Sequence, residues 1–592
     1  MRCRGFLFFL LLLFPVFSLS AGDSGEWRAM AVVRFGNIDA IDAEEGGLAS
    51  FLRKVRNDGR FTPPVRTLIG PEIRNPTLFG LSYEAWMEAV VFAPQRAGAA
   101  RVLWVFPVDS RDEYMTHLAN QGLAEYEGMD GVSVIRELDA DGNSRVWYME
   151  WLPGNVAVFG ANRDAVFSAK KMYAEQGASR GLLAEAGGDF VEPDMMLRII
   201  PPNVASWQNA ELGRYWFRGL IDRLRDDLVA AWRPGSARVR LLNSLADELV
   251  LWPRSLDRVD LSLWLEDDGF EWRLDAAGDF SVSYPPSQFE AIRRLPERTA
   301  MAYSIPVSRQ LYASLSSFAG RLLLDGAGGA VNTESRRTAQ LIDGLLADGR
   351  LLQMCSAWVA PPAGRPELGG VRLLITEWEK PEQAERAWAE LVAAVEQDSP
   401  VLQTLAQLGW KVDIIADSEV EGSAEIVVSS ISETDGEEYY RAAFVARRRG
   451  SWMALVGGTT RADAESRRDV MEYRGELAAQ CLERSDPGIP DVRNAFTRVS
   501  RRGASFLGIL DPVRLLQFMF VEAADWRRRS PDQREPLSTQ LAREMLEYGA
   551  AGSLSASGER VDDGWRFNGG ISWESLFRLS AVLGITESIG VE

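Results

Sequence analysis

Few residues in this chain have the types and spacing that chemistry requires. The run Asp139-Ala140-Asp141-Gly142-Asn143, with Glu150 at the twelfth position, is similar to the start of a calcium-binding loop. That loop needs glycine at its sixth position, where this chain has Ser144, and it needs flanking helices. The flanking segments VSVIREL and RVWYMEW alternate in polarity, which predicts strands. Because Asp-Gly-Asn favours tight turns, we interpret the run as a hairpin turn.

Three other patterns are equally short. Ser168 and Lys171 have the spacing at which a helical lysine activates a serine, but the sequence lacks the Lys-Thr-Gly and Ser-Asp-Asn elements that accompany it. The glycine-rich run at 326–330 lacks the Lys-Ser or Lys-Thr of a phosphate-binding loop. Adjacent carboxylates suit acid–base catalysis only where they face a pocket, and these pairs are Glu44-Glu45, Asp226-Asp227 and Glu437-Glu438. We therefore assign no catalytic, cofactor-binding or metal-binding residue.

Histidine and cysteine are scarce. The chain has one histidine, His117, and three cysteines. Most histidine-based metal sites and catalytic triads need a second imidazole or a cysteine partner. Cys3 precedes the apolar run at the N-terminus, so export would leave Cys355 and Cys481. An even number of cysteines in an exported protein permits a disulfide between them, and two buried free thiols fit the sequence equally well.

The first twenty residues have the pattern of a secretory signal peptide. Arg2 and Arg4 are followed by an apolar run at Phe6–Phe17, and the small residues of Ser18–Ser20 precede Ala21. The apolar run is shorter than the roughly 20 residues that span a bilayer, and no later stretch is long and apolar enough. We therefore predict a signal peptide at 1–20, no membrane span after its removal, and a periplasmic or secreted protein.

The net charge restricts the partners. A formal charge of −19 without a basic cluster argues against binding to nucleic acid or to anionic membrane surfaces. The apolar content of 46% is that of a globular chain rather than a disordered one. Nineteen tryptophans are available for core packing or, where exposed, for lining a groove that takes an apolar ligand.

The elements that would position these residues occur twice. A strand, a turn, a second strand and a helix are predicted at Arg145–Met172, with the helix capped near Asn162, and a similar stretch returns at Tyr440–Met471 with Gly160 matching Gly457. Four further matches keep the same order: Trp27–Val33 with Arg298–Ser304, Val102–Phe106 with Arg372–Thr376, Met196–Pro202 with Phe506–Pro512, and Leu265–Leu274 with Arg560–Gly569. We predict two divergent tandem copies at 27–297 and 298–592.

Within each copy, short strands alternate with helices and hairpin turns are frequent. This pattern predicts an α+β fold with mainly antiparallel sheets and helices packed on one face. The order of elements at 101–172 is close to a ferredoxin-like arrangement.

These observations favour a non-catalytic, exported cell-envelope protein that binds a partner or acts as a scaffold. What the copies share is mainly apolar and glycine positions, as expected for a retained core rather than for two active sites. Two alternatives stay open: a carrier of an apolar ligand such as a lipid, and a hydrolase that needs only two carboxylates. The partner is thus an unknown protein or an apolar ligand, and no cofactor is expected.

Overall fold

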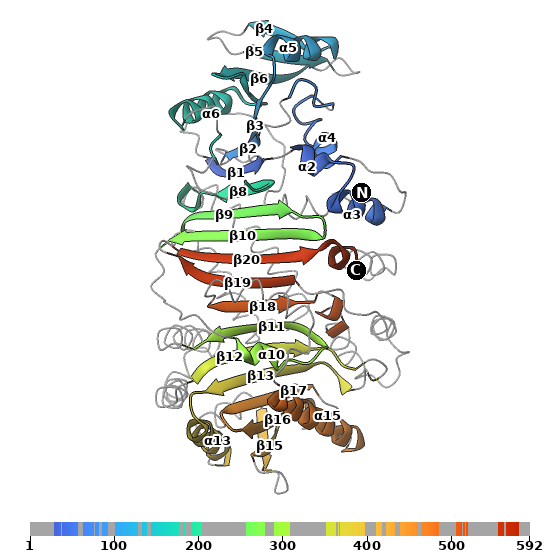
Figure 1. Cartoon of the computed structure of the whole chain (residues 1–592), viewed down its shortest axis with the longest axis vertical. Coiled ribbons are helices and arrows are strands. Elements are labelled where there is room, and N and C mark those ends of the chain that lie inside the picture. The colour runs from blue at the N-terminus through green and yellow to red at the C-terminus, as the bar shows by residue number, and fades with distance from the viewer. Residues whose placement is uncertain are drawn as a thin grey trace. The chain divides into compact units, whose positions relative to one another are not determined.

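The structure is a computed structural model of the chain (Figure 1). It describes residues 29–36, 38–56, 63–75, 77–81, 86–92, 101–127, 133–138, 144–176, 181–183, 192–203, 256–278, 289–307, 351–362, 365, 368–396, 410–416, 422–431, 438–459, 464–484, 505–511, 513–515, 517–518, 554–561 and 564–578. The predicted signal peptide at 1–20 lies outside these residues.

The chain forms two compact units. Unit 1 comprises Met1–Leu228, Ala246–Asp279 and Asp563–Asn568, and unit 2 comprises Val229–Leu245, Phe280–Asp562 and Gly569–Glu592.

Unit 1 contains one antiparallel run of paired strands in the order β4-β5-β6-β7-β3-β2-β1-β8-β9-β10 (Figure 1). Its strands are β1 (Ala29–Phe35), β2 (Met87–Phe92), β3 (Arg101–Pro107), β4 (Ala124–Glu127), β5 (Ser133–Leu138), β6 (Ser144–Leu152), β7 (Val156–Gly160), β8 (Met195–Ile199), β9 (Leu256–Leu265) and β10 (Gly269–Gly278). Its described helices are α2 (Ile38–Asp42), α3 (Gly47–Arg56), α4 (Pro64–Leu68), α5 (Arg111–Asn120) and α6 (Arg163–Gln176).

The strands of unit 2 pair in the order β14-β15-β16-β17-β13-β12-β11-β18-β19, all antiparallel. They are β11 (Thr299–Pro306), β12 (Leu351–Val359), β13 (Val371–Trp378), β14 (Trp410–Ala416), β15 (Ser423–Ile431), β16 (Glu438–Arg449), β17 (Trp452–Thr459), β18 (Phe506–Leu510) and β19 (Leu554–Val561). The last strand, β20 (Gly564–Ser572), has residues in both units. The described helices are α10 (Glu290–Arg293), α13 (Pro381–Glu396) and α15 (Ala464–Glu483). Read from β14, the order of these nine strands matches that of the first nine strands of unit 1, read from β4.

Mixed helices and mainly antiparallel strands are therefore confirmed, and so is the helix cap. The Asn162 side chain accepts a hydrogen bond from the Ala165 backbone amide at 2.9 Å, which satisfies an amide that the first turn of α6 leaves unpaired.

The prediction that helices pack on one face is wrong. In unit 1, α6 packs with Val156 and Val158 on one side of β7, while α5 packs in the cluster that contains Ala157 and Phe159 on the other side. In unit 2, α15 and α13 pack into separate clusters from opposite faces of β13. The reason is visible in β7, whose five residues are all buried, as in strands covered on both faces. The ferredoxin-like arrangement predicted for 101–172 also requires its helices on one face, so it is not confirmed.

The predicted match of Gly160 with Gly457 is one residue out of register. Gly160 ends β7, and a Cβ at this position would lie 2.1 Å from Cδ2 of Leu103 in β3 and 3.6 Å from Cγ2 of Val166 in α6. The glycine of β17 that faces the helix is Gly458, where a Cβ would lie 3.3 Å from Nη2 of Arg474 in α15. Gly160 pairs with Leu103 of β3, whereas Leu373, the residue of β13 that matches Leu103, pairs with Val456. The strand register therefore places Val456, and not Gly457, at the position of Gly160.

Candidate functional site

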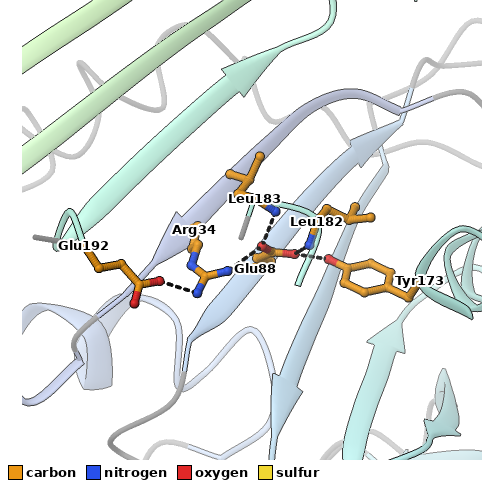
Figure 2. Close-up of polar contacts among 6 residues, drawn as sticks. All are labelled: Arg34, Glu88, Tyr173, Leu182, Leu183 and Glu192. Carbon is orange, nitrogen blue, oxygen red and sulfur yellow. Dashed lines mark hydrogen bonds and ion pairs between the residues drawn. The ribbon is translucent and has the colours of Figure 1, made fainter. Parts of the chain in front are cut away.

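The carboxylate of Glu88 in β2 is fully buried and accepts several hydrogen bonds (Figure 2). Its Oε2 accepts a hydrogen bond from the Leu182 backbone amide at 2.9 Å, and its Oε1 accepts one from the Leu183 amide at 3.1 Å. The Tyr173 hydroxyl of α6 donates to Oε2. The carboxylate therefore joins the sheet to α6 and to the segment 181–183. We call Arg34, Glu88 and Tyr173, with the two amides, the Glu88 cluster.

Arg34 supplies the positive charge of this cluster. It lies on β1, whose residue 34 is paired with residue 88 of β2, so the two side chains emerge side by side. Its Nη1 is 3.4 Å from Oε1 of Glu88, and its Nη2 contacts Oε1 of Glu192 at 2.5 Å. The guanidinium also lies over the ring of Trp86, 5.4 Å from its centroid, where a cation is attracted to the aromatic face. Glu192 is exposed, so this last ion pair connects the cluster to the surface.

Tyr173 acts as a fixed hydrogen-bond donor. Burial, and then the charge of Glu88, raise the pKa of the Tyr173 hydroxyl well above its ordinary value. The hydroxyl therefore keeps its proton at neutral pH and donates a hydrogen bond to the carboxylate. Its ring stacks on Trp86 with centroids 6.2 Å apart, so the position of the donor is set by packing as well as by the hydrogen bond.

Gly181 allows the segment 181–183 to approach the carboxylate. Its φ is +78°, a backbone conformation that glycine adopts without steric cost. A Cβ at this position would lie 2.6 Å from Oε1 of Glu88 and 2.8 Å from Nη1 of Arg34. The residue is thus required by both the turn and the close approach.

Replacing Gly181 with alanine should displace the segment from the carboxylate. We expect a loss of stability of about 1–3 kcal/mol, from the positive φ and from overpacking against charged atoms. Amide hydrogen exchange of Leu182 and Leu183 measures the displacement of the segment, and both amides should exchange faster than in the natural protein. Gly154→Ala is a matched control, because Gly154 also has a positive φ (+81°) but no atom lies within 4 Å of the added Cβ. Equal exchange at Leu182 and Leu183 in the two variants would show that close approach is not the constraint.

The arrangement is suited to holding segments together rather than to reacting with a substrate. Both oxygens of Glu88 are engaged by groups of the same chain, and the side chain has no exposed surface. A general base has to reach the proton that it abstracts. Within the described residues, no group of three or more histidine, cysteine, aspartate and glutamate side chains is placed to hold a metal ion.

The residues considered in the sequence analysis are not brought together. Lys171 is exposed, while its neighbour Lys170 binds Oε2 of the buried Glu150 at 2.7 Å, so Ser168 is not part of a serine–lysine pair. His117 stacks on Phe79, with ring centroids 4.7 Å apart. Glu44 and Glu45 are exposed. The runs 139–143 and 326–330, the pair 226–227 and Glu437 lie outside the described residues.

The sequence analysis did not identify Arg34, Glu88 or Tyr173. They are far apart in the chain and match no motif. A usable signal was present, because Arg34 and Glu88 each interrupt a strongly apolar strand, AMAVVRF and MEAVVF. Charged residues in such positions are almost always paired when buried.

Cys355 and Cys481 are buried free thiols in the structure, so it shows the second of the two predicted alternatives. Cys355 lies on β12 and Cys481 on α15, and both belong to the main core cluster of unit 2. Burial, and then the charge of Cys481, raise the pKa of the Cys355 thiol. Burial raises the pKa of the Cys481 thiol to about 12, although Arg484 and Arg294 oppose the shift.

Both thiols should react slowly in the folded protein. The thiolate is the reactive form, and burial disfavours it while also blocking access. In protein that lacks residues 1–20, an aromatic disulfide reagent should release two equivalents of thiolate in denaturant and almost none in the native state. Absence of release in denaturant without reductant would show that the two cysteines are bonded.

Among the described helices, none has the length and apolar character needed to cross a membrane.

No known protein family matches the chain, and no curated protein matches it. The chain is similar to solved structures of TP0453. Crystal form III has 10% sequence identity and a TM-score of 0.21, covering 51% of this chain and 99% of TP0453. Crystal form I has 11% identity and a TM-score of 0.19, covering 43% and 78%. At these TM-scores the likeness supports no inference about fold or function.

Proposed function

We propose that this chain is an exported, non-catalytic binding or scaffold protein of the cell envelope. The observation that carries the proposal is the Glu88 cluster. A buried carboxylate, an arginine and a tyrosine are the groups from which an active site is often built. Here the arginine and the tyrosine both bind the carboxylate, which also accepts hydrogen bonds from two backbone amides. This arrangement supports a role in fixing the segment 181–183 and α6 to the sheet.

Export is supported by the sequence of residues 1–20. Two arginines, a short apolar run and small residues in that order form the pattern of a cleavable leader. The acidic net charge supports a protein partner or an apolar ligand over nucleic acid.

A duplication at 27–297 and 298–592 belongs to the same proposal. It is supported by the five ordered sequence matches and by the shared order of strand pairing. Such repetition doubles a surface that is held by a rigid sheet, which suits binding two similar partners or one extended partner.

A double variant, Arg34→Met with Glu88→Leu, tests the non-catalytic role. It removes both charges together, and replacing a buried ion pair by apolar residues is often tolerated. Introduced in place of the natural chain in its own cell, the folded and exported variant should support the same envelope function. Circular dichroism and the amount in the envelope fraction check folding and export, and Glu192→Ala is the control.

Loss of function in a variant that is folded and exported at the normal level would contradict the proposal. If the double variant does not fold, Tyr173→Phe provides the test. It removes only the hydroxyl and keeps the ring that stacks on Trp86. If the hydroxyl were an active-site donor, this variant would lose function although its packing is unchanged.

A further inference from the structure

Two arginines of unit 2, Arg298 and Arg514, lie close enough to repel each other electrostatically. The Asp511 backbone amide donates to the Ala300 carbonyl at 2.7 Å, which brings the segment after β18 against the start of β11. Arg298 lies two residues before Ala300, and Arg514 lies three residues after Asp511. The two guanidinium groups interact with each other electrostatically, and burial and this repulsion lower the pKa of Arg298.

Each arginine has a buried nitrogen without a hydrogen-bond partner: Nε of Arg298 and Nη1 of Arg514. The Arg514 side chain is only 16% exposed, and its Nε contacts Oδ2 of Asp511 at 3.3 Å. Among the described residues, Arg298 has no ion pair or side-chain hydrogen bond, and Tyr473 lies close enough to oppose the lowering of its pKa. Glu297 is exposed and acts on Arg514. The two positive charges of Arg298 and Arg514 are thus offset by two carboxylates: Asp511, which is bonded to Arg514, and Glu297, which is exposed.

In unit 1, the position that corresponds to Arg514 has a neutral side chain, while the position that corresponds to Arg298 is Arg28, which lies outside the described residues. There the Ile200 amide donates to the Met30 carbonyl at 2.8 Å, in the same relation as Asp511 to Ala300. Three residues further, Asn203 donates its side-chain amide to the Ala29 carbonyl at 2.8 Å. A neutral side chain therefore takes the place of Arg514 in unit 1, so a cation at this position is not a requirement of the fold.

We propose that Arg298 and Arg514 form a binding site for a phosphate-sized oxyanion. A partly buried cation is costly unless it is paired and hydrogen-bonded. The planar guanidinium fork matches the oxygens of phosphate and carboxylate. A phosphate group carries close to two negative charges at neutral pH and has enough oxygens to accept from both side chains, whereas a carboxylate carries one charge. The unpaired nitrogens and the two charges therefore favour phosphate. This site goes beyond the proposed scaffold role and does not depend on it.

The test is thermal unfolding and calorimetric titration of the purified protein with inorganic phosphate, at constant ionic strength set with chloride. A ligand that binds only the folded state raises the unfolding temperature. Phosphate should raise it saturably, and acetate should have a smaller effect. Arg298→Gln should weaken phosphate binding at least tenfold. Without phosphate, this variant should unfold no lower than the natural protein, since it removes a like-charge repulsion.

Arg449→Gln is the control, because Arg449 lies in the same unit, is largely exposed and binds Glu483. It should respond to phosphate like the natural protein. Arg514→Gln should also weaken binding, and if its lost contact with Asp511 prevents folding, Arg298→Gln decides alone. The proposal is overturned if phosphate gives no saturable shift in the natural protein, or if Arg298→Gln binds phosphate as tightly as Arg449→Gln.

Discussion

Replacing Glu88 with alanine is expected to lower the stability of unit 1 by about 3–5 kcal/mol. The change leaves the buried Arg34 without its buried carboxylate and removes the acceptor of the Tyr173 hydroxyl and of the Leu182 and Leu183 amides. An unpaired buried charge and unsatisfied buried donors are among the costliest single defects in a protein. Amide hydrogen exchange across β1 and β2, read by mass spectrometry, measures the loss.

Glu192→Ala is the matched control, because it removes the other carboxylate that Arg34 contacts. Glu192 is exposed, and exposed ion pairs contribute about 0–1 kcal/mol. The double variant Arg34→Met with Glu88→Leu should be more stable than Glu88→Ala, since both buried charges are absent. If Glu88→Ala and Glu192→Ala lose the same small amount, the cluster does not hold the sheet together.

Replacing Arg474 with alanine is expected to cost unit 2 about 3 kcal/mol or more. Arg474 lies on α15 and is fully buried, and its Nη1 donates to the carbonyls of Ala443 on β16 and Gly458 on β17. Each buried carbonyl that loses its donor costs about 1–3 kcal/mol, and truncation of a large buried side chain leaves a cavity. Faster hydrogen exchange in α15, β16 and β17 would report the loss.

Arg449→Ala is the control for this second change. Arg449 is at the end of β16 and binds Glu483 near the end of α15, but both side chains are largely exposed. It should lose no more than about 1 kcal/mol. Equal protection of α15 in the natural protein and in Arg474→Ala would contradict the role assigned to this arginine.

The sequence was a good guide to elements that depend on local patterns. The strands β6 and β7, the helix α6 and its Asn162 cap follow from alternation, turn residues and capping chemistry within a few residues. The same holds for the antiparallel class, because short strands joined by hairpins leave few other arrangements.

Features that depend on contacts between distant segments were not predictable. Helices on both faces require strands that are buried on both sides. The run VAVFG of β7 is too short to show whether one face or both faces of the sheet are covered. Gly457 lies one residue beyond the position that corresponds to Gly160, and a glycine has no side chain to indicate its face. Arg34 and Glu88 become partners only when β1 and β2 pair in one register.

The central claim is that the chain is exported and binds without catalysing a reaction. Native mass spectrometry of protein purified without denaturation from its own envelope fraction tests it most directly. The account predicts a chain that lacks residues 1–20 and has no covalent modification. This chain should carry an intact partner protein that dissociates from it on collisional activation in the mass spectrometer. A chain that retains residues 1–20 and is found in the cytoplasm would contradict export, and a covalently attached acyl or glycosyl fragment that turns over would contradict the non-catalytic role.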